Sequence, residues 1–210
     1  PFGSEFSFGT SNDDIITGRN LAGLSGNDTL VGISGDYNNL KGLAGDDTLY
    51  GQDLDDRLDG GAGNDVIYAG DGMDTVYGGS GNDILYGGGA VDFLYGGEGN
   101  DWLDGGEGGD ILTGGLGADI FVFKNATAFG YEDVIQDFSI SEGDKIDISD
   151  VLSAFDPLSD VIANFGELTW DGLKIDQSGS GSNFVKIANV YSQETLDDIS
   201  TLYQNGSIIV

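Results

Sequence analysis

The sequence contains neither cysteine nor histidine. Disulfide bonds and thiol chemistry are therefore excluded, as are imidazole-dependent triads and the zinc and copper sites that these side chains usually build. Only 2 of the 210 residues are proline, which excludes collagen-like and proline-rich chains. No run of apolar residues approaches the length of a transmembrane helix, so no membrane span is expected.

Positive charge is also scarce. Lysine and arginine total 7 against 37 aspartates and glutamates, which gives a net charge of -30. That charge repels nucleic acid and anionic membranes, and it opposes compaction unless cations neutralise it. The hydrophobic content of 39% is too high for a disordered acidic tail. Carboxylate and carbonyl oxygens suit hard cations, calcium first, so the composition predicts a fold neutralised by metal ions.

A nine-residue repeat runs without a gap from Gly42 to Val122, in nine copies of the pattern G-G-x-G-x-D-x-U-x, where U is a large apolar residue. The clearest copies begin at Gly60, Gly78, Gly96, Gly105 and Gly114. The sixth-position aspartates are Asp47, Asp56, Asp65, Asp74, Asp83, Asp92, Asp101, Asp110 and Asp119. The eighth-position residues are Leu49, Leu58, Ile67, Val76, Leu85, Leu94, Leu103, Leu112 and Phe121.

Several copies depart from this pattern. Upstream, Asp14 and Asp28 belong to irregular copies, and a copy between Asp28 and Asp47 has Asn38 at the aspartate position and a one-residue insertion. Residues 52–54 contain no glycine, and Ala90 replaces a fourth-position glycine. The turn at residues 52–54 is expected to bind metal weakly or differently. Ala69 replaces the first glycine of its copy, and the Asn38 copy lacks the acidic ligand.

One nonapeptide is expected to form half a coil of a parallel solenoid. Its glycines supply the positive φ angles that other residues resist, and the three residues after the aspartate form a short strand. Alternation along that strand directs the eighth position inward and the seventh and ninth outward. Turns of repeats n and n+2 then lie on the same edge.

Burial alone is not expected to stabilise such a coil. Ordering nine residues costs roughly 9–18 kcal/mol of backbone entropy, whereas one buried leucine returns about 1.5–3 kcal/mol. Metal binding is therefore predicted to be part of the folding free energy.

These nonapeptides resemble the RTX (repeats-in-toxin) proteins, and the resemblance implies an all-β, right-handed parallel β-roll with calcium along both edges. In that family two sixth-position aspartates and carbonyls of the glycine turn hold each ion, which implies about seven or more Ca²⁺ here. The glycines implied as ligands are Gly60, Gly61, Gly63, Gly78, Gly79, Gly81, Gly96, Gly97, Gly99, Gly105, Gly106, Gly108, Gly114, Gly115 and Gly117. The implied aspartates are the nine above with Asp14 and Asp28.

The sequence divides into a roll at residues 7–122 and a cap at residues 123–210. Phe121, Val122, Phe123 and Phe129 are expected to cover the open end of the roll. Short strands are predicted around 168–175 and 184–187, a helix at about 149–155 and another from Ser192 to Tyr203. Residues 1–6 are interpreted as a cloning remnant, because Gly3-Ser4-Glu5-Phe6 matches adjacent cloning sites.

The cap segment resembles the type I secretion region of RTX proteins, with Ile208, Ile209 and Val210 as a hydrophobic ending; the alternative is an edge strand that completes the cap. The leading hypothesis is a non-enzymatic, extracellular module that folds on calcium after export, within a surface adhesin or another RTX exoprotein. The alternative is an accessory module of a secreted alginate epimerase, protease or lipase. Intrinsic catalysis is the least favoured. Tyrosines at the ninth positions form either ordinary packing ladders or a polysaccharide-contacting strip.

Overall fold

The computed structural model describes residues 6–124 and 132–149, strands at 168–169, 172–176 and 184–190, and residues 206–209. The predictions that concern Phe129 and the two helices near 149–155 and 192–203 lie outside these residues, as does most of the proposed cloning remnant. The described part of the chain contains no helix with the length and hydrophobicity that crossing a bilayer requires.

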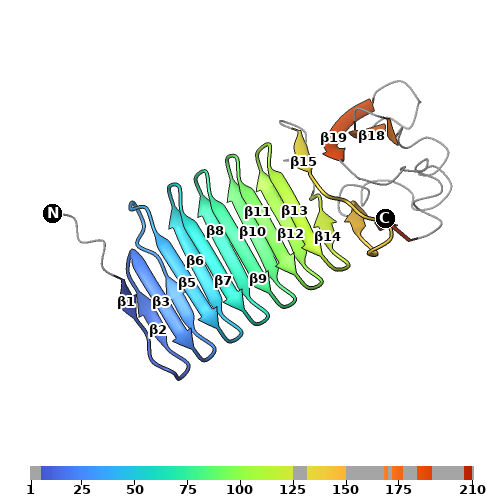
Figure 1. Cartoon of the computed structure of the whole chain (residues 1–210). Coiled ribbons are helices and arrows are strands. Elements are labelled where there is room, and N and C mark those ends of the chain that lie inside the picture. Colours follow the sequence, from blue (N-terminus) through green and yellow to red (C-terminus); the bar gives the residue numbers. More distant parts are fainter. Residues whose placement is uncertain are drawn as a thin grey trace.

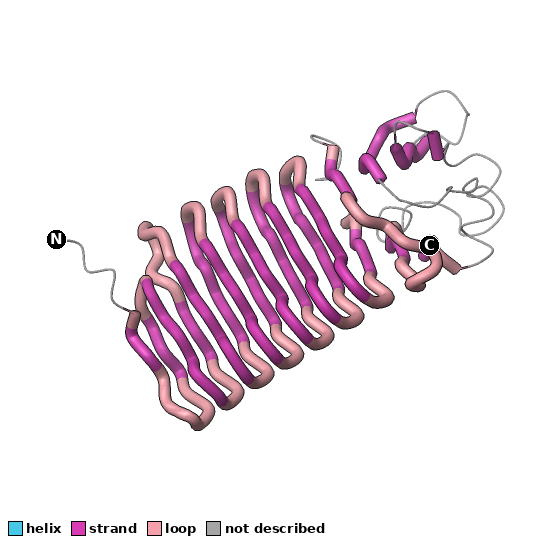
Figure 2. Tube along the Cα trace, viewed as in Figure 1, coloured by secondary structure: helices cyan, strands magenta, loops and turns pink. Residues whose placement is uncertain are grey.

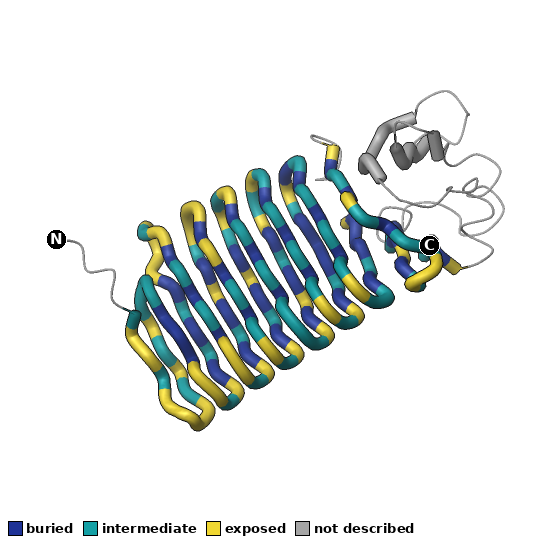
Figure 3. Tube along the Cα trace, in the orientation of Figure 1, coloured by how far each residue is buried: buried dark blue, intermediate teal, exposed yellow. Residues whose placement is uncertain are grey.

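Side chains alternate between the inside and the outside along each strand. In β10 (Ile84–Gly89), Leu85 and Gly87 are buried while their neighbours are half-buried or exposed. Asp83, directly before the strand, is buried as well. Positions six, eight and one of the repeat therefore face inward, and the same alternation is visible along the roll in Figure 3.

The strands form two sheets that face each other across a narrow core (Figure 1). Pairing is parallel throughout the roll and antiparallel among the strands at 168–169, 172–176 and 184–190. In spatial order, one sheet contains β1 (Ser7–Phe8), β3 (Asn20–Ser25), β5 (Asn39–Ala44), β7 (Arg57–Ala62), β9 (Thr75–Ser80), β11 (Phe93–Glu98), β13 (Ile111–Leu116), β15 (Asp133–Ile135), β19 (Phe184–Val190), β18 (Gly172–Asp176) and β17 (Leu168–Thr169). The other contains β2 (Ile15–Thr17), β4 (Thr29–Val31), β6 (Thr48–Asp53), β8 (Val66–Asp71), β10, β12 (Trp102–Glu107), β14 (Ile120–Val122), β16 (Lys145–Asp147) and β20 (Ile208–Ile209).

From β1 to β16 consecutive strands alternate between the sheets, so each pair of nonapeptides completes one coil. Leu85 pairs in register with Ile67 and Leu103, each 18 residues away. The prediction that repeats n and n+2 stack on the same edge is confirmed, and the chain forms the expected all-β parallel β-roll.

One apolar residue from each strand fills the core. Every eighth-position residue from Leu49 to Phe121 has no exposed surface, and Leu21, Leu30 and Leu40 extend the column toward the N-terminus. The column is narrow because the other inward positions hold glycine and aspartate. The buried apolar surface per coil is therefore small, as the repeat predicts.

The strands are longer than the three residues predicted from the sequence. From β5 to β13 each has six residues and continues through the first three positions of the next repeat, as Figure 2 shows. The ladder passes through the glycines, as in the pairing of Gly88 with Gly70 and Gly106. Weak strand propensity of glycine suggested a turn, but the ladder from neighbouring coils overrides it.

The cap continues both sheets beyond the repeats. β15 and β16 add to β13 and β14 in parallel, and Phe138 packs on Phe121 with ring centroids 6.2 Å apart. Phe123 is also buried, so apolar side chains continue the core beyond the last repeat. The predicted strands near 168–175 and 184–187 correspond to β17, β18 and β19, and β20 pairs with β16 as an edge strand.

Irregular copies keep a positive φ at glycine positions of the repeat, with residues that resist it. Gln52, Leu54 and Ala90 have φ angles of 95°, 67° and 81°. Gly72 and Gly99, at fourth positions of regular copies, have φ of 132°. A left-handed conformation costs a residue with a β-carbon about 1–2 kcal/mol, so these turns are strained.

We expect Ala90→Gly to stabilise the calcium-loaded protein by about 1 kcal/mol, because glycine removes the steric penalty at this φ and loses only part of that gain to chain entropy. Thermal unfolding in saturating calcium measures the change. The matched control is Ala62→Gly, where φ is not positive and glycine should destabilise. An Ala90→Gly variant no more stable than the parent would contradict the assignment of strain.

Candidate metal centre

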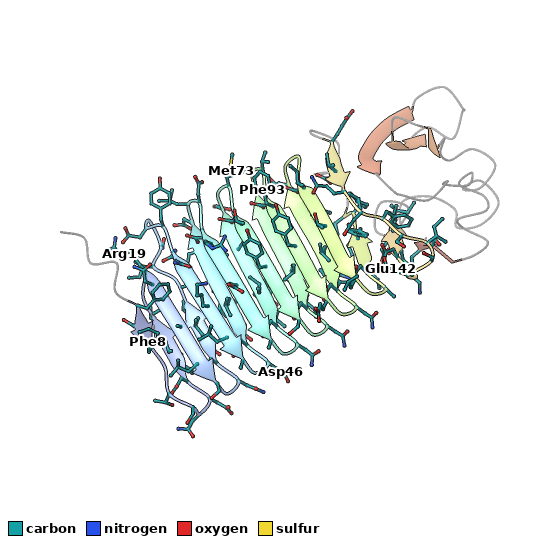
Figure 4. All side chains as sticks on the ribbon, viewed as in Figure 1. Phe8, Arg19, Asp46, Met73, Phe93 and Glu142 are labelled. Atoms are coloured by element: carbon teal, nitrogen blue, oxygen red, sulfur yellow. The ribbon has the colours of Figure 1, made fainter. Side chains whose placement is uncertain are left out.

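The sixth-position aspartates form one buried row along each edge of the roll. After Asp14, one carboxylate oxygen of each accepts a hydrogen bond from the backbone N–H of the equivalent residue one coil earlier, which is Asn38 for Asp56 and an aspartate for the others. Asp47 N–H donates to Asp65 Oδ1 at 2.7 Å, and Asp65 N–H to Asp83 Oδ1 at 2.8 Å. The first edge holds Asp14, Asp28, Asp47, Asp65, Asp83, Asp101 and Asp119. The second holds Asp56, Asp74, Asp92 and Asp110. Figure 4 labels Asp46 and Met73, which precede Asp47 and Asp74, on the two opposite edges.

The other oxygen of most of these carboxylates has no hydrogen-bond donor. Among the described residues this atom, Oδ2, is buried and unpartnered in Asp28, Asp47, Asp65, Asp74, Asp83, Asp92, Asp101, Asp110 and Asp119. An ionised carboxylate can only accept, so its burial without a donor is unfavourable. The same unpartnered oxygen occurs in nine side chains at equivalent positions of the repeat, which indicates a ligand-binding feature.

The first glycine of the repeat leaves a small cradle beside the unpartnered oxygen in every copy except that of Asp74, where Ala69 takes its place. A β-carbon built on Gly60 would lie less than 3.0 Å from both Asp65 Oδ2 and the carbonyl oxygen of Gly78, one coil further on. Only glycine fits there. Gly78 has the same relation to Asp83 and Gly96. Two oxygen acceptors thus converge on a point with no hydrogen between them, an arrangement that favours a cation.

The second and fourth glycines bend the chain around this cradle. Gly61 and Gly63 have φ of 110° and 133°, and a β-carbon on Gly63 would collide with the carbonyl of Gly45 in the preceding coil. The turns therefore stack with carbonyl groups in close contact. The same conformation is found at Gly79, Gly81, Gly97, Gly99, Gly106, Gly108, Gly115 and Gly117.

Carboxylates alone do not complete a metal site. No group of three or more acidic side chains converges on one point in the described part of the chain. Backbone carbonyls must supply the remaining ligands. Calcium takes 6–8 oxygen ligands, including carbonyls, at 2.3–2.6 Å, and therefore suits this donor set better than softer metals do.

Burial makes these carboxylates unusually basic in the absence of metal. Burial raises the pKa of Asp65 from 3.8 to about 7, with repulsion from Asp83 and Asp47 in the same direction. Burial also raises the pKa of Asp92 to about 8, with added repulsion from Asp74 and Asp110. The backbone N–H bond at Oδ1 lowers each value but does not offset burial.

Asp14 differs from the other predicted ligands. It lies at the start of the first row, where Asp14 N–H donates to Asp28 Oδ1 at 2.7 Å. Its own Oδ2 accepts hydrogen bonds from the backbone N–H and the hydroxyl of Thr10. The first coil therefore lacks the unpartnered oxygen of the later coils.

Two aspartates of the cap extend the rows, which the repeat pattern did not predict. Asp110 N–H donates to Asp133 Oδ1 at 2.8 Å, and Asp119 N–H donates to Asp144 Oδ1 at 3.0 Å. The separations are 23 and 25 residues instead of 18. A signal was present, because Asp133-Val134-Ile135 and Asp144-Lys145-Ile146 both repeat the aspartate-x-apolar element of the nonapeptide.

A second, exposed ladder on the first edge was also missed. Fifth-position side chains accept backbone N–H groups from the next coil, as in Asn82 N–H to Asn64 Oδ1 at 2.8 Å and Asn100 N–H to Asn82 Oδ1 at 2.7 Å. Asp13, Asn27, Asp46 and Asn100 belong to the same row. These bonds connect neighbouring coils without metal.

The repeats match a known family. Residues 34–53, 50–85 and 86–121 match the RTX calcium-binding nonapeptide repeat. The chain belongs to the RTX family. RTX repeats bind calcium and are typical of extracellular, secreted proteins.

Solved structures similar to this RTX chain include the solution structure of a subunit from the Azotobacter vinelandii mannuronan C5-epimerase. It is 31% identical, the match covers 67% of this chain and 72% of that one, and the TM-score is 0.44. No curated protein sequence matches the chain.

We expect the metal-free RTX roll to lose stability as the pH rises. The unfolded carboxylates ionise around pH 3.8, whereas in the folded roll Asp65 and Asp92 hold their protons to about pH 7 and 8. Because the unfolded state releases protons first, stability is greatest in acid and declines between these values. Far-UV circular dichroism in chelator should show more β-structure at pH 4 than at pH 8. Equal spectra would contradict the raised pKa values.

Calcium should reverse this dependence. Metal binding requires ionised carboxylates, so protons compete with calcium and the calcium concentration needed for folding should rise as the pH falls below the raised pKa values. Calcium titrations at pH 5.5 and pH 8 measure the shift. A midpoint independent of pH would show that the buried carboxylates are not the ligands.

Proposed function

We propose that this chain is a calcium-dependent folding module in which calcium ions bridge neighbouring coils. Each ion is held by sixth-position carboxylates of repeats n and n+2 and by carbonyls of the glycine turns. The observation that carries the proposal is the set of nine buried Oδ2 atoms without donors, six of which lie beside a carbonyl oxygen of the turn one coil further on.

The ions would be shared by successive aspartates on one edge. Among the regular repeats the proposed pairs are Asp47 with Asp65, Asp56 with Asp74, Asp65 with Asp83, Asp74 with Asp92, Asp83 with Asp101, Asp92 with Asp110, and Asp101 with Asp119. This gives about seven ions. Asp28, unpartnered in the same way beside the carbonyl of Gly42, extends the first edge.

The free-energy cost of burying these oxygens supports a strict requirement for metal at neutral pH. One buried acceptor without a donor costs about 1–3 kcal/mol, and an ionised one costs more. A domain is stable by only about 5–15 kcal/mol, so a few such groups are enough to unfold it. Calcium removes this cost and neutralises part of the net charge of -30. Folding and ion binding are then a single process.

We propose further that this coupling serves export. In a low-calcium cytosol the chain stays unfolded and can be threaded through a type I secretion apparatus, and it folds outside the cell. Residues 123–210 would act as a cap and as the secretion signal, and the parent protein would be a surface adhesin or another RTX exoprotein. RTX membership and the metal-dependent core support this role.

The direct experiment is a calcium titration of the 210-residue chain in chelated buffer at pH 7.5, with far-UV circular dichroism and native mass spectrometry. We expect a cooperative gain of β-structure with a midpoint near or below about 0.1–1 mM and about seven bound ions. A chain that is equally folded in chelator would refute the proposal.

Two adjacent substitutions separate ligation from ordinary hydrogen bonding. Asp83→Asn should remove one or two ions and raise the calcium midpoint, because one carboxylate oxygen becomes an NH₂ group. Asn82→Ala should keep the ion count and cost only about 0.5–1.5 kcal/mol, since it removes one exposed ladder bond. Equal ion counts in the two variants would show that Asp83 is not a ligand.

A polysaccharide-contacting accessory role is the second candidate, and the aromatic rows favour it. Tyr50, Tyr68 and Tyr86 stack on the outer face of one sheet with ring centroids 5.2 and 4.8 Å apart. On the outer face of the other sheet, Tyr77 stacks on Tyr95. The predicted outward ladders are thus confirmed. Ordinary cross-strand packing is the alternative interpretation of these rows. Glycan binding by the folded parent that disappears in a Tyr68→Ala/Tyr86→Ala variant would support this role.

A further inference from the structure

The turn that contains Asn38 differs from every other turn on the second edge. Given the proposed function, we infer that the side-chain amide of Asn38 takes the place of a calcium ion, so that this turn is closed without metal. The calcium row of the second edge would then begin at the pair formed by Asp56 and Asp74.

The contacts of the Asn38 amide are those expected of the cation. Asn38 is buried, and its Nδ2 donates to the carbonyl oxygen of Gly51 at 2.8 Å and to the two carboxylate oxygens of Asp56 at 3.0 and 3.2 Å. Gly51 is the first residue of the repeat one coil after Asn38, just as Gly78 is the first residue of the repeat one coil after Asp65. The carbonyl oxygens of Gly51 and Gly78 are therefore equivalent. The NH₂ group lies between the carbonyl oxygen of Gly51 and a carboxylate of the kind whose Oδ2 has no donor in the other copies.

Asp56 shows the consequence. Its Oδ2 accepts a bond from Asn38, and Asp56 is absent from the set of aspartates with an unpartnered Oδ2. The next aspartate on the same edge, Asp74, has an unpartnered Oδ2. The amide therefore supplies, at one position of the row, the donor that the remaining positions lack.

The surrounding hydrogen bonds fix the orientation of the amide. Asn38 Oδ1 accepts from Ile33 N–H at 2.8 Å, while the carbonyl oxygens of Asp36 and Gly51 and the Asp56 carboxylate all face Nδ2. A rotated amide would place its oxygen against those acceptors and its NH₂ against the N–H of Ile33. Only the orientation with NH₂ in the cradle satisfies both sides.

The one-residue insertion builds the turn around this amide. Asp36 N–H bonds back to the carbonyl of Ile33 at 3.2 Å, and the carbonyl oxygen of Asp36 points at Nδ2 from 3.0 Å. Arg19 forms an ion pair with the Asp36 carboxylate at 3.3 Å, so this turn also carries its own positive charge. The turn is thus a metal-independent attachment point between the first coils of the roll.

Asn38→Asp tests the inference, because it replaces the NH₂ group with an oxygen and restores the regular set of acceptors. Native mass spectrometry of the full chain in saturating calcium should show one more bound ion than the parent. The control is Asn64→Asp, which adds the same charge at an exposed fifth position where the preceding coil already has Asp46. It should leave the count unchanged.

The outcomes separate this inference from the proposed function. A parent chain that binds no calcium defeats both. A parent that binds about seven ions, together with a folded Asn38→Asp variant that binds the same number, defeats only the inference.

If Asn38→Asp does not fold, hydrogen exchange in the calcium-loaded parent decides the matter. The Asn38 NH₂ protons should exchange far more slowly than those of the exposed Asn12. Exchange as fast as that of Asn12 would overturn the inference.

Discussion

A buried carboxylate oxygen that faces a carbonyl oxygen with no hydrogen between them is the constraint on which the roll depends. Asp65 Oδ2 and Gly78 O represent the regular case. In most copies the first position is glycine, because a β-carbon would fill the cradle; the buried Ala69 is the exception, and the following glycines adopt positive φ to stack the turns. The apolar column is too thin to offset the cost of these oxygens, so a cation has to supply the missing charge.

The two edges distribute this dependence differently. The first edge has the longer row, which ends at Asp144, and the exposed ladder of Asn64, Asn82 and Asn100 ties its coils together without metal. On the second edge the described residues show a single fifth-position bond of this kind, from Met73 N–H to Asp55. There, at the N-terminal end, Asn38 supplies a fixed donor. Contacts that need no metal therefore concentrate on the first edge and at one turn of the second, while unpartnered carboxylate oxygens are present on both edges.

The sequence predicts the fold and most of the candidate site because each coil repeats the same pattern of residue types. A glycine pair, an aspartate and an apolar residue at fixed spacing determine what faces inward at Leu85 and Asp83. The prediction was incomplete where neighbouring coils decide the outcome. Six-residue strands through Gly88 arise from ladder pairing, and Asp133 joins a row after a 23-residue separation that breaks the period. The amide of Asn38 could be recognised as a donor only from its contacts.

The most direct measurement is the calcium anomalous signal of crystals grown in abundant calcium. The account predicts peaks beside the Oδ2 atoms of the regular aspartates, each within about 2.3–2.6 Å of carboxylate and carbonyl oxygens from two stacked turns. An intact roll in which those oxygens have no anomalous peak beside them would contradict the claim that calcium holds the coils together.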